Sequence, residues 1–146
     1  MNPVWIERNN FLIDYDLQNK SVLDFGCGDK SVCNYIDFKS YVGYDINPLA
    51  DYKVDFNKKF TIKHTAEVGL VLGVLEYLVD PEQFLQTIQP TCDKFVIMTL
   101  NTKAPKISRG WKQVYNENTL VTLLNKHFST VKIAKINKYI LADCYK

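Results

Sequence analysis

The sequence predicts an α/β fold, a doubly wound and mostly parallel sheet that carries an antiparallel hairpin strand at its C-terminal end. Apolar stretches with strand character alternate with stretches of helical periodicity along the chain, and this alternation is typical of a parallel sheet covered by helices on both faces. Residues 68–72 form a near-continuous apolar run, as expected for a strand buried on both faces. Two final strand-like segments separated by Asn137 and Lys138 predict a hairpin.

The first half of the chain contains four expected strands and two expected helices. The first strand ends abruptly in a glycine-containing loop, and Pro48 prevents the second strand from continuing. Asp80 is a good helix cap and Pro81 suits the first helical position, so a helix should begin there. Its apolar face is formed by Phe84, Leu85 and Ile88. The strands are expected at residues 21–25, 41–45, 52–56 and 68–72, and the earlier, brief helix at about 30–36.

The second half repeats this alternation. A central strand is expected at residues 95–98, followed by a polar, basic loop from 101 to about 115. Residues 116–119 should start a helix, because the apolar residues that follow recur at helical spacing (Leu120, Leu123, Leu124 and Phe128). The hairpin strands are expected at 131–136 and 139–144.

Composition limits the function classes. The 146 residues are 47% hydrophobic, 13% aromatic and 23% charged, which excludes a disordered chain and predicts one domain over residues 1–146. The formal net charge of +2 argues against a protein dedicated to coating nucleic acid. No apolar run approaches the roughly 18 residues of a membrane span, and the N-terminus lacks the pattern of a signal peptide.

The cysteines indicate a reducing compartment. Cys27, Cys33, Cys92 and Cys144 form no CxxC pair and no cluster with histidine. We therefore expect reduced thiols in a cytoplasmic protein, with neither a disulfide framework nor a metal site.

A glycine-containing loop and an acidic strand end lie where an α/β sheet binds its ligands. Such ligands bind beyond the carboxyl ends of the strands, near the point where strand order reverses. The loop after the first expected strand contains Gly26 and Gly28, which permit a tight turn and a close ligand approach. The second strand ends in Asp45, whose carboxylate can accept both hydroxyls of a ribose. Together they predict a nucleoside-binding site.

Three nucleotide ligands fit this pattern to different degrees. A phosphate-binding P-loop needs the GxxxxGK[ST] spacing, which residues 26–31 (GCGDKS) lack. A dinucleotide fold needs GxGxxG, for which Gly26 and Gly28 satisfy only two positions. S-adenosylmethionine has no pyrophosphate and needs an acidic residue before the glycines for its ammonium group, and Asp24 stands there. The residues themselves leave a dinucleotide site and an S-adenosylmethionine site open.

Four segments in chain order resemble class I S-adenosylmethionine-dependent methyltransferases. Residues 22–28 (VLDFGCG) look like the first motif of this family, and residues 41–47 (YVGYDIN) look like its second-strand motif. Residues 73–85 (GVLEYLVDPEQFL) are similar to the segment after its fourth strand, and residues 114–120 (VYNENTL) to a late stretch. The resemblance implies a Rossmann-like cofactor-binding fold over residues 21–146, preceded by an N-terminal extension over residues 1–20.

The resemblance implies that the nucleoside part of S-adenosylmethionine is held at two strand ends. Asp45 would hold the ribose, with Ile46 against the adenine. Asp55 and Phe56 would meet the adenine amino group and ring. Phe56 also fits a core position, and Asp55 also fits a solvated strand end.

The resemblance also implies which residues surround the methionine part of the cofactor. Asp24 would act on the amino group, directly or through water. The loop residues Gly26, Cys27 and Gly28 would line the methionine part. Leu72 and Gly73 would pass under the sulfonium.

Two departures from the family's pattern bear on the pocket. The usual third glycine of the first motif is replaced near Lys30 and Ser31, and the family's common histidine after the Leu-Glu pair is Tyr77 here. Methyl transfer is an in-line displacement on an activated sulfonium, for which a general base is optional. Glu76, Tyr77 and His64 are candidates for such a base, and no catalytic residue is assigned among them.

The basic loop is a candidate acceptor-binding segment. Lys103, Lys106, Arg109 and Lys112 could contact an anionic or phosphorylated acceptor. The alternative is a solvated loop with Trp111 packed against the domain.

Two function classes therefore remain in view beside an NAD-dependent dehydrogenase. The first is a methyltransferase that acts on a small-molecule or carrier-linked acceptor. The second is a catalytically weak or inactive protein of the same fold that binds or scaffolds a partner. An open acceptor face is compatible with a homodimer or a partner subunit.

Overall fold

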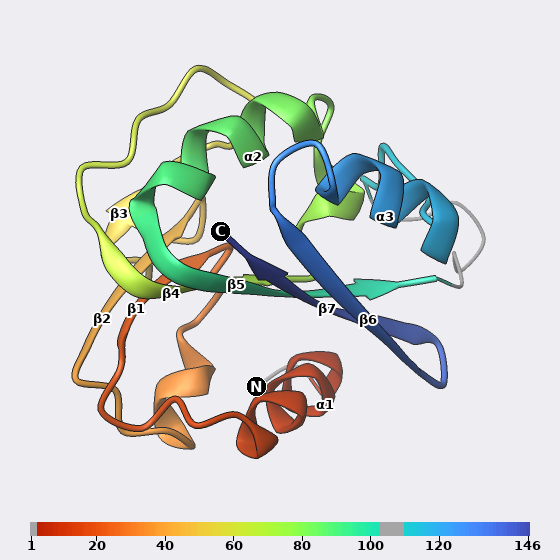
Figure 1. Ribbon diagram of the computed structural model, residues 1–146. Coiled ribbons are helices and arrows are strands. Elements are labelled where there is room, and N and C mark those ends of the chain that lie inside the picture. Colours follow the sequence, from red (N-terminus) through yellow and green to blue (C-terminus); the bar gives the residue numbers. More distant parts are fainter. Residues whose placement is uncertain (1–2, 103–109) are drawn as a thin grey trace.

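The computed structural model describes residues 3–102 and 110–146, with side chains from Ile6 onward. Its centre is a seven-stranded sheet of order β3-β2-β1-β4-β5-β7-β6 (Figure 1). Strands β1 to β5 run parallel, and β7 is antiparallel to both of its neighbours. The strands are β1 (Ser21–Phe25), β2 (Ser40–Asp45), β3 (Tyr52–Lys53), β4 (Ala66–Leu72), β5 (Cys92–Asn101), β6 (Thr130–Ile136) and β7 (Tyr139–Tyr145). The predicted doubly wound α/β fold with an antiparallel C-terminal hairpin is confirmed.

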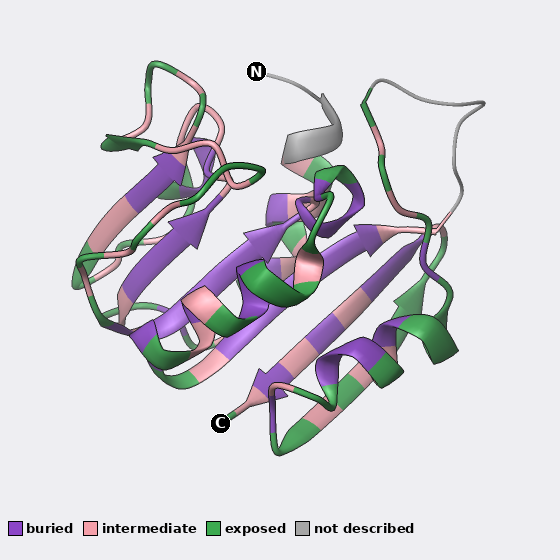
Figure 2. Ribbon diagram, turned by 90° about the horizontal axis from the view of Figure 1, so that it is seen from above, coloured by how far each residue is buried: buried purple, intermediate pink, exposed green. Residues whose placement is uncertain are grey.

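Helices cover both faces of the sheet. α2 (Pro81–Ile88) and α3 (Glu117–Leu124) lie on one face, and α1 (Pro3–Asn10) lies on the other (Figure 1). Each face has its own cluster of buried apolar side chains, and Figure 2 shows that the central strands carry most of the buried residues. The pattern follows from parallel strands that are apolar on both sides, because both faces must then be covered.

The capping signals predicted for the helices are present in the structure. The Asp80 carboxylate accepts a hydrogen bond from the Gln83 backbone N–H at 3.0 Å, and Pro81 is the first residue of α2. Asn116 and Thr119 form a reciprocal capping box at the start of α3, with distances of 2.8 and 3.0 Å. These bonds satisfy backbone N–H groups that have no partner within the helix.

Three elements differ from the sequence prediction. The helix expected at about 30–36 is a single 3-10 turn at Ser31–Asn34, preceded by Lys30 in the left-handed region at a φ of 59°. The strand expected at 52–56 pairs only over β3, because the chain enters a turn closed by the Lys58 N–H and the Asp55 carbonyl. Helix α1 was not predicted, since its sequence lacks an apolar stripe.

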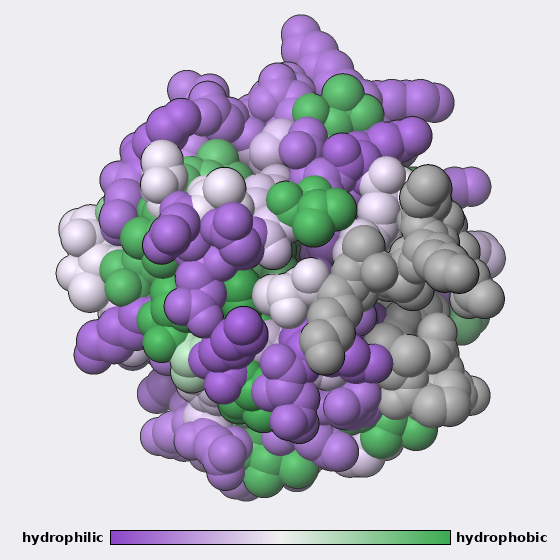
Figure 3. Space-filling view, turned by 90° about the vertical axis from the view of Figure 1, so that its right-hand side faces the viewer, coloured by the Kyte–Doolittle hydropathy of each residue, from purple (hydrophilic) through white to green (hydrophobic). Residues whose placement is uncertain are grey.

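The hairpin edge of the sheet is largely polar. β6 is the edge strand, and its residues are half-buried or exposed, among them Lys132 and Lys135. Figure 3, which views the molecule from the side of α3 and the hairpin, shows mostly hydrophilic residues with scattered apolar ones among the described atoms. Lysines on an edge strand oppose pairing with another chain.

Candidate functional site

A cavity of about 330 Å³ lies at the carboxyl ends of β1, β2 and β4, with α1 forming part of its wall. This volume falls in the range of small-molecule sites. The structure brings all ten residues of the predicted cofactor site into its lining. They are Asp24, Gly26, Cys27, Gly28, Asp45, Ile46, Asp55, Phe56, Leu72 and Gly73.

Asp24 is a buried carboxylate at the cavity wall. It lies near the end of β1, a strand that is paired on both sides, and the residue is only 2% exposed. Its Oδ2 atom accepts a hydrogen bond from the Tyr41 hydroxyl at 2.6 Å. Its Oδ1 atom is buried and has no hydrogen-bond partner among the described residues. Burial raises the pKa of Asp24 from 3.8 to about 7, against the opposing effect of the Tyr41 hydrogen bond.

The loop after β1 turns tightly beside this carboxylate. Gly26 and Gly28 have φ angles of 90° and 56°, which favour glycine. A Cβ atom at Gly26 would lie 2.3 Å from a methyl group of Val74, so the loop can pass this close only as bare backbone. Both Gly26 and Cys27 donate their N–H groups to the Tyr44 carbonyl, at 2.7 and 3.2 Å. Burial raises the pKa of the Cys27 thiol, which therefore stays neutral.

Asp45, at the end of β2, is hydrogen-bonded to the same loop. Its Oδ2 atom accepts the Gly28 N–H at 2.7 Å, and its Oδ1 atom accepts the Asn47 N–H at 2.9 Å. Each carboxylate oxygen can accept more than one hydrogen bond, so both retain capacity for a ligand. The neighbouring Ile46 is 61% exposed at the cavity wall, which leaves an apolar surface available there.

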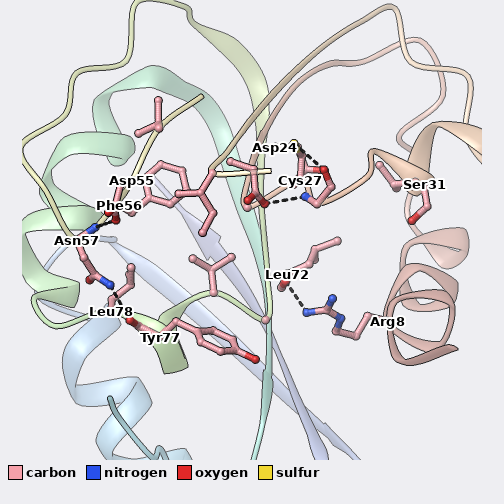
Figure 4. Close-up of a pocket in the computed structure, with 18 of the residues that line it drawn as sticks. Arg8, Asp24, Cys27, Ser31, Asp55, Phe56, Asn57, Leu72, Tyr77 and Leu78 are labelled. Carbon is pink, nitrogen blue, oxygen red and sulfur yellow. Dashed lines mark hydrogen bonds between the residues drawn. The ribbon is translucent and has the colours of Figure 1, made fainter. Parts of the chain in front are cut away.

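The segment after β3 forms the opposite wall (Figure 4). Phe56 lines the cavity and also packs edge-on against Phe25 and Phe84, so it serves the core and the cavity together. Asp55 accepts the Asn57 N–H at 2.9 Å. The Asn57 amide in turn donates to the Tyr77 carbonyl at 3.0 Å, which ties this wall to the segment after β4.

Arg8 of α1 is a cavity residue that sequence reasoning missed. Its Nη1 atom donates to the Leu72 carbonyl at 2.7 Å, and Figure 4 shows the side chain pointing toward Leu72 from the α1 side. A Cβ atom at Gly73, which has a φ of 67°, would lie 1.8 Å from this Nη1 atom. Burial lowers the pKa of Arg8, while Glu76 and Asp24 are among the groups that raise it. The motif segments give no signal for Arg8, because it lies in the extension before the first motif.

Two further polar residues of the lining tie α1 to the loop after β1. Asn9 donates from Nδ2 to the Ser31 hydroxyl at 3.0 Å, and both residues are buried. Ser31 stands near the position where the family's third glycine is replaced, and Lys30 before it adopts the left-handed conformation that a glycine would take. The loop thus keeps its turn without that glycine.

The three candidate bases lie in different surroundings. Tyr77 lines the cavity and is 41% exposed. Glu76 is buried outside the lining, where its Oε2 atom accepts the Asn101 N–H at 3.2 Å and burial raises its pKa. His64 is hydrogen-bonded to the Tyr44 hydroxyl and lies against the ring of Tyr52, away from the cavity lining.

The basic loop is described only in part. Lys103, Lys106 and Arg109 lie outside the described residues. Lys112 is exposed, and its backbone N–H donates to the Glu76 carbonyl at 2.7 Å. Trp111 packs edge-on against Tyr77, with ring centroids 6.3 Å apart, which places an aromatic pair next to the cavity.

Comparison with models of known protein families identifies the family of the chain. A family model described as a methyltransferase domain matches residues 1–138. The chain belongs to this family. The recognition of a class I methyltransferase from the four sequence segments is confirmed, and S-adenosylmethionine is the cofactor of this methyltransferase. A comparison with curated protein sequences finds no significant match.

Solved structures share the methyltransferase's fold at low identity. An S-adenosylmethionine-dependent methyltransferase from Mesorhizobium loti has a TM-score of 0.72 and 13% identity, over 97% of this chain and 97% of its own. The N-methyltransferase NodS from Bradyrhizobium japonicum, in complex with S-adenosyl-L-homocysteine, has a TM-score of 0.71 and 16% identity, over 99% and 88%. A complex between the Haloferax volcanii Trm112 methyltransferase activator and its partner protein has a TM-score of 0.72 and 11% identity, over 97% of this chain and 89% of the matched chain.

The methyltransferase's cavity suits this cofactor chemically. An ammonium group would supply the partner that the buried Oδ1 atom of Asp24 lacks. The bare backbone at Gly26 and Gly73 keeps the wall free of Cβ atoms that the structure has no room for. Among the described residues, no group of three or more His, Cys, Asp or Glu side chains could hold a metal ion. No described helix is long and apolar enough to span a membrane.

Proposed function

We propose that this methyltransferase binds S-adenosylmethionine in the cavity at the ends of β1, β2 and β4, and transfers its methyl group to a small-molecule or carrier-linked acceptor. The observation that carries the proposal is the convergence of all ten predicted cofactor-site residues on one cavity. These residues come from four separate segments of the chain, so their meeting in one place is a property of the fold and not of sequence proximity.

The polar groups of the cavity match the polar groups of the cofactor's amino acid part. Asp24 binds the ammonium group through its free Oδ1 atom, directly or through water. Arg8 also lines the cavity. One of its guanidinium N–H groups donates to the Leu72 carbonyl, and its remaining N–H groups bind the carboxylate of the cofactor. Gly26, Cys27 and Gly28 line the chain between them.

The residues at the end of β2 and after β3 hold the nucleoside. Asp45 accepts the ribose hydroxyls, and Ile46 lies against the adenine. Asp55 receives the adenine amino group, while the ring of Phe56 borders the base. Leu72 and Gly73 pass under the sulfonium, where a side chain at residue 73 would collide with Arg8.

The chain's own contribution to methyl transfer is positioning. The bound cofactor supplies a methyl group already activated by its sulfonium, so the residues have to hold donor and acceptor in line and exclude water. Of the three base candidates, Tyr77 alone lines the cavity, and its hydroxyl is placed to hydrogen-bond the acceptor there. Burial and the Asn101 hydrogen bond give Glu76 a supporting position instead.

The acceptor enters beside Tyr77 and Trp111 and is anionic. Lys112 and the cations at 103, 106 and 109 follow β5 in the chain, and β5 ends on the same edge of the sheet as the cavity. A second copy of the chain or a partner subunit can cover this face. The protein acts in the cytoplasm. Charge reversal at these cations that left acceptor affinity unchanged would contradict this assignment.

Calorimetry with S-adenosylmethionine and S-adenosylhomocysteine tests the cofactor site. Asp45→Ala should weaken the binding of each ligand by about 1–3 kcal/mol, because the ribose hydroxyls lose their hydrogen-bond acceptor. Asp51→Ala is the matched control, since Asp51 also accepts a backbone N–H, from Gly43 at 2.8 Å, but does not line the cavity; its affinity should stay near that of the unaltered chain. Equal losses in both variants would contradict the role of Asp45.

The same titration separates the alternative functions. Binding of neither cofactor form would defeat the enzyme proposal and leave a scaffold of the same fold. NAD that binds more tightly than S-adenosylmethionine would favour a dehydrogenase.

A further inference from the structure

Tyr41 stands directly behind the carboxylate that faces the cofactor. It lies on β2, two positions before Gly43, the residue that pairs with Asp24 across the strands. Its hydroxyl donates to Oδ2 of Asp24 at 2.6 Å, yet Tyr41 is not part of the cavity lining. Its ring stacks on Phe38, with centroids 5.5 Å apart and planes 25° apart, so the hydroxyl is held in place from the far side.

Room for this arrangement depends on Gly43. A Cβ atom there would lie 2.7 Å from Sγ of Cys27 and 3.3 Å from the ring of Tyr41. The bare backbone at residue 43 therefore lets the thiol and the phenol share the space beside Asp24. Burial raises the pKa of Tyr41, so the phenol remains a proton donor throughout the neutral range.

The other groups that act on Asp24 are less direct. The Asp45 carboxylate raises the pKa of Asp24 and the Arg8 guanidinium lowers it, each through charge and without a hydrogen bond. Desolvation by burial, and to a smaller extent the Asp24 charge, raises the pKa of the Cys27 and Cys33 thiols, so both thiols stay uncharged. Among the described residues, the Tyr41 hydroxyl is the hydrogen-bond donor to Asp24.

We propose that Tyr41 is a positioning residue for cofactor binding, whose hydroxyl holds Oδ2 of Asp24 and leaves its Oδ1 atom free for the cofactor's ammonium group. A donor to Oδ2 favours the charged carboxylate over the protonated acid. It also fixes the rotation of the carboxyl group, so that one oxygen is occupied and the other is available. This inference rests on the proposed cofactor site.

The test is the pH dependence of S-adenosylhomocysteine binding by Tyr41→Phe. Loss of the donor should raise the pKa of Asp24 by about one unit. The variant should then bind about tenfold more weakly than the unaltered chain at pH 6, and about equally at pH 9. The ratio of the two affinities is the readout, because titration of the ligand's own amino group cancels in it.

Tyr15→Phe is the matched control. The Tyr15 hydroxyl also donates to an aspartate, Asp143, and its ring packs against the same apolar cluster as Tyr41. Tyr15 does not line the cavity, so its loss should leave the affinity ratio flat with pH. A flat ratio for Tyr41→Phe as well would overturn the inference.

Two measurements keep this result separate from the proposed function. Carboxyl ¹³C titration of Asp24 without ligand should show the higher midpoint in Tyr41→Phe, and equal midpoints would refute the role of Tyr41 even if no ligand binds. If Tyr41→Phe does not fold, the unaltered chain should show a slowly exchanging Tyr41 hydroxyl proton by NMR, and rapid exchange of that proton would count against the bond. Failure of the unaltered chain to bind would refute the cofactor site alone.

Discussion

Replacing Asp24 with asparagine should separate the stability of the fold from its function. The carboxyl group is buried, with a pKa raised from 3.8 to about 7 by burial. Between these two values the unfolded chain releases a proton that the folded chain retains, so the free energy of unfolding falls as pH rises. The contribution of the protonated Asp24 carboxyl to stability is fully present below about pH 4 and is lost as pH rises through about 7.

The size of this effect follows from the two pKa values. Their separation corresponds to about 4 kcal/mol at pH 8, and an asparagine does not incur this loss while it can still accept the Tyr41 hydrogen bond through its amide oxygen. We therefore expect the unfolding free energy of Asp24→Asn, minus that of the unaltered chain, to increase by up to about 4 kcal/mol between pH 4 and pH 8. Urea denaturation at each pH measures this difference. Its affinity for S-adenosylmethionine should fall about 10- to 100-fold. A stability difference that does not change with pH would refute the reasoning.

Three further substitutions test the site and the fold that supports it. Gly73→Ala should lose about 1–3 kcal/mol of unfolding free energy and weaken cofactor binding, because its Cβ would lie 1.8 Å from Arg8. Gly110→Ala, also at positive φ but with its nearest neighbour at 3.8 Å, should leave binding intact; equal binding losses in both would contradict the steric account. A backbone N–H and a lysine lower the pKa of Glu67 to about 2, so Glu67→Gln should be less stable than the unaltered chain near pH 7. Urea denaturation should show this stability difference closing as pH falls from 4.5 to about 2, and a difference that stays constant would contradict the reasoning. Phe84→Ala should lose about 3–5 kcal/mol by thermal unfolding, since its ring is fully buried, and a loss below 1 kcal/mol would contradict its core position.

Sequence periodicity predicted the fold where local signals and tertiary packing agree. Residues 21–25 are bounded by turn signals and pair as β1, and the capping residue Asp80 starts α2 as expected. The prediction failed for α1, whose residues become ordered through contacts distant in sequence, such as that between Arg8 and Leu72. It also overextended the strand at 52–56, where the chain turns away from the sheet after Lys53.

Most of the cavity lining was predictable from the segments that resemble the family. Asp24 and Asp45 belong to segments with a recognisable spacing, and both line the cavity. Arg8 belongs to none, because it comes from the extension. Tyr41 begins the second-strand segment, but the sequence pattern does not show that its hydroxyl reaches Asp24 from behind the lining. The roles of all these residues, and the division of the chain into an extension and a cofactor-binding fold, stay predictions.

The structure of the chain with S-adenosylhomocysteine is the most direct test of the proposed cofactor site. The ligand should occupy the cavity at the ends of β1, β2 and β4, with its ribose hydroxyls on Asp45 and its amino group within reach of Oδ1 of Asp24. A ligand bound elsewhere, or bound in the cavity with its ribose away from Asp45 and its amino group away from Asp24, would contradict the account.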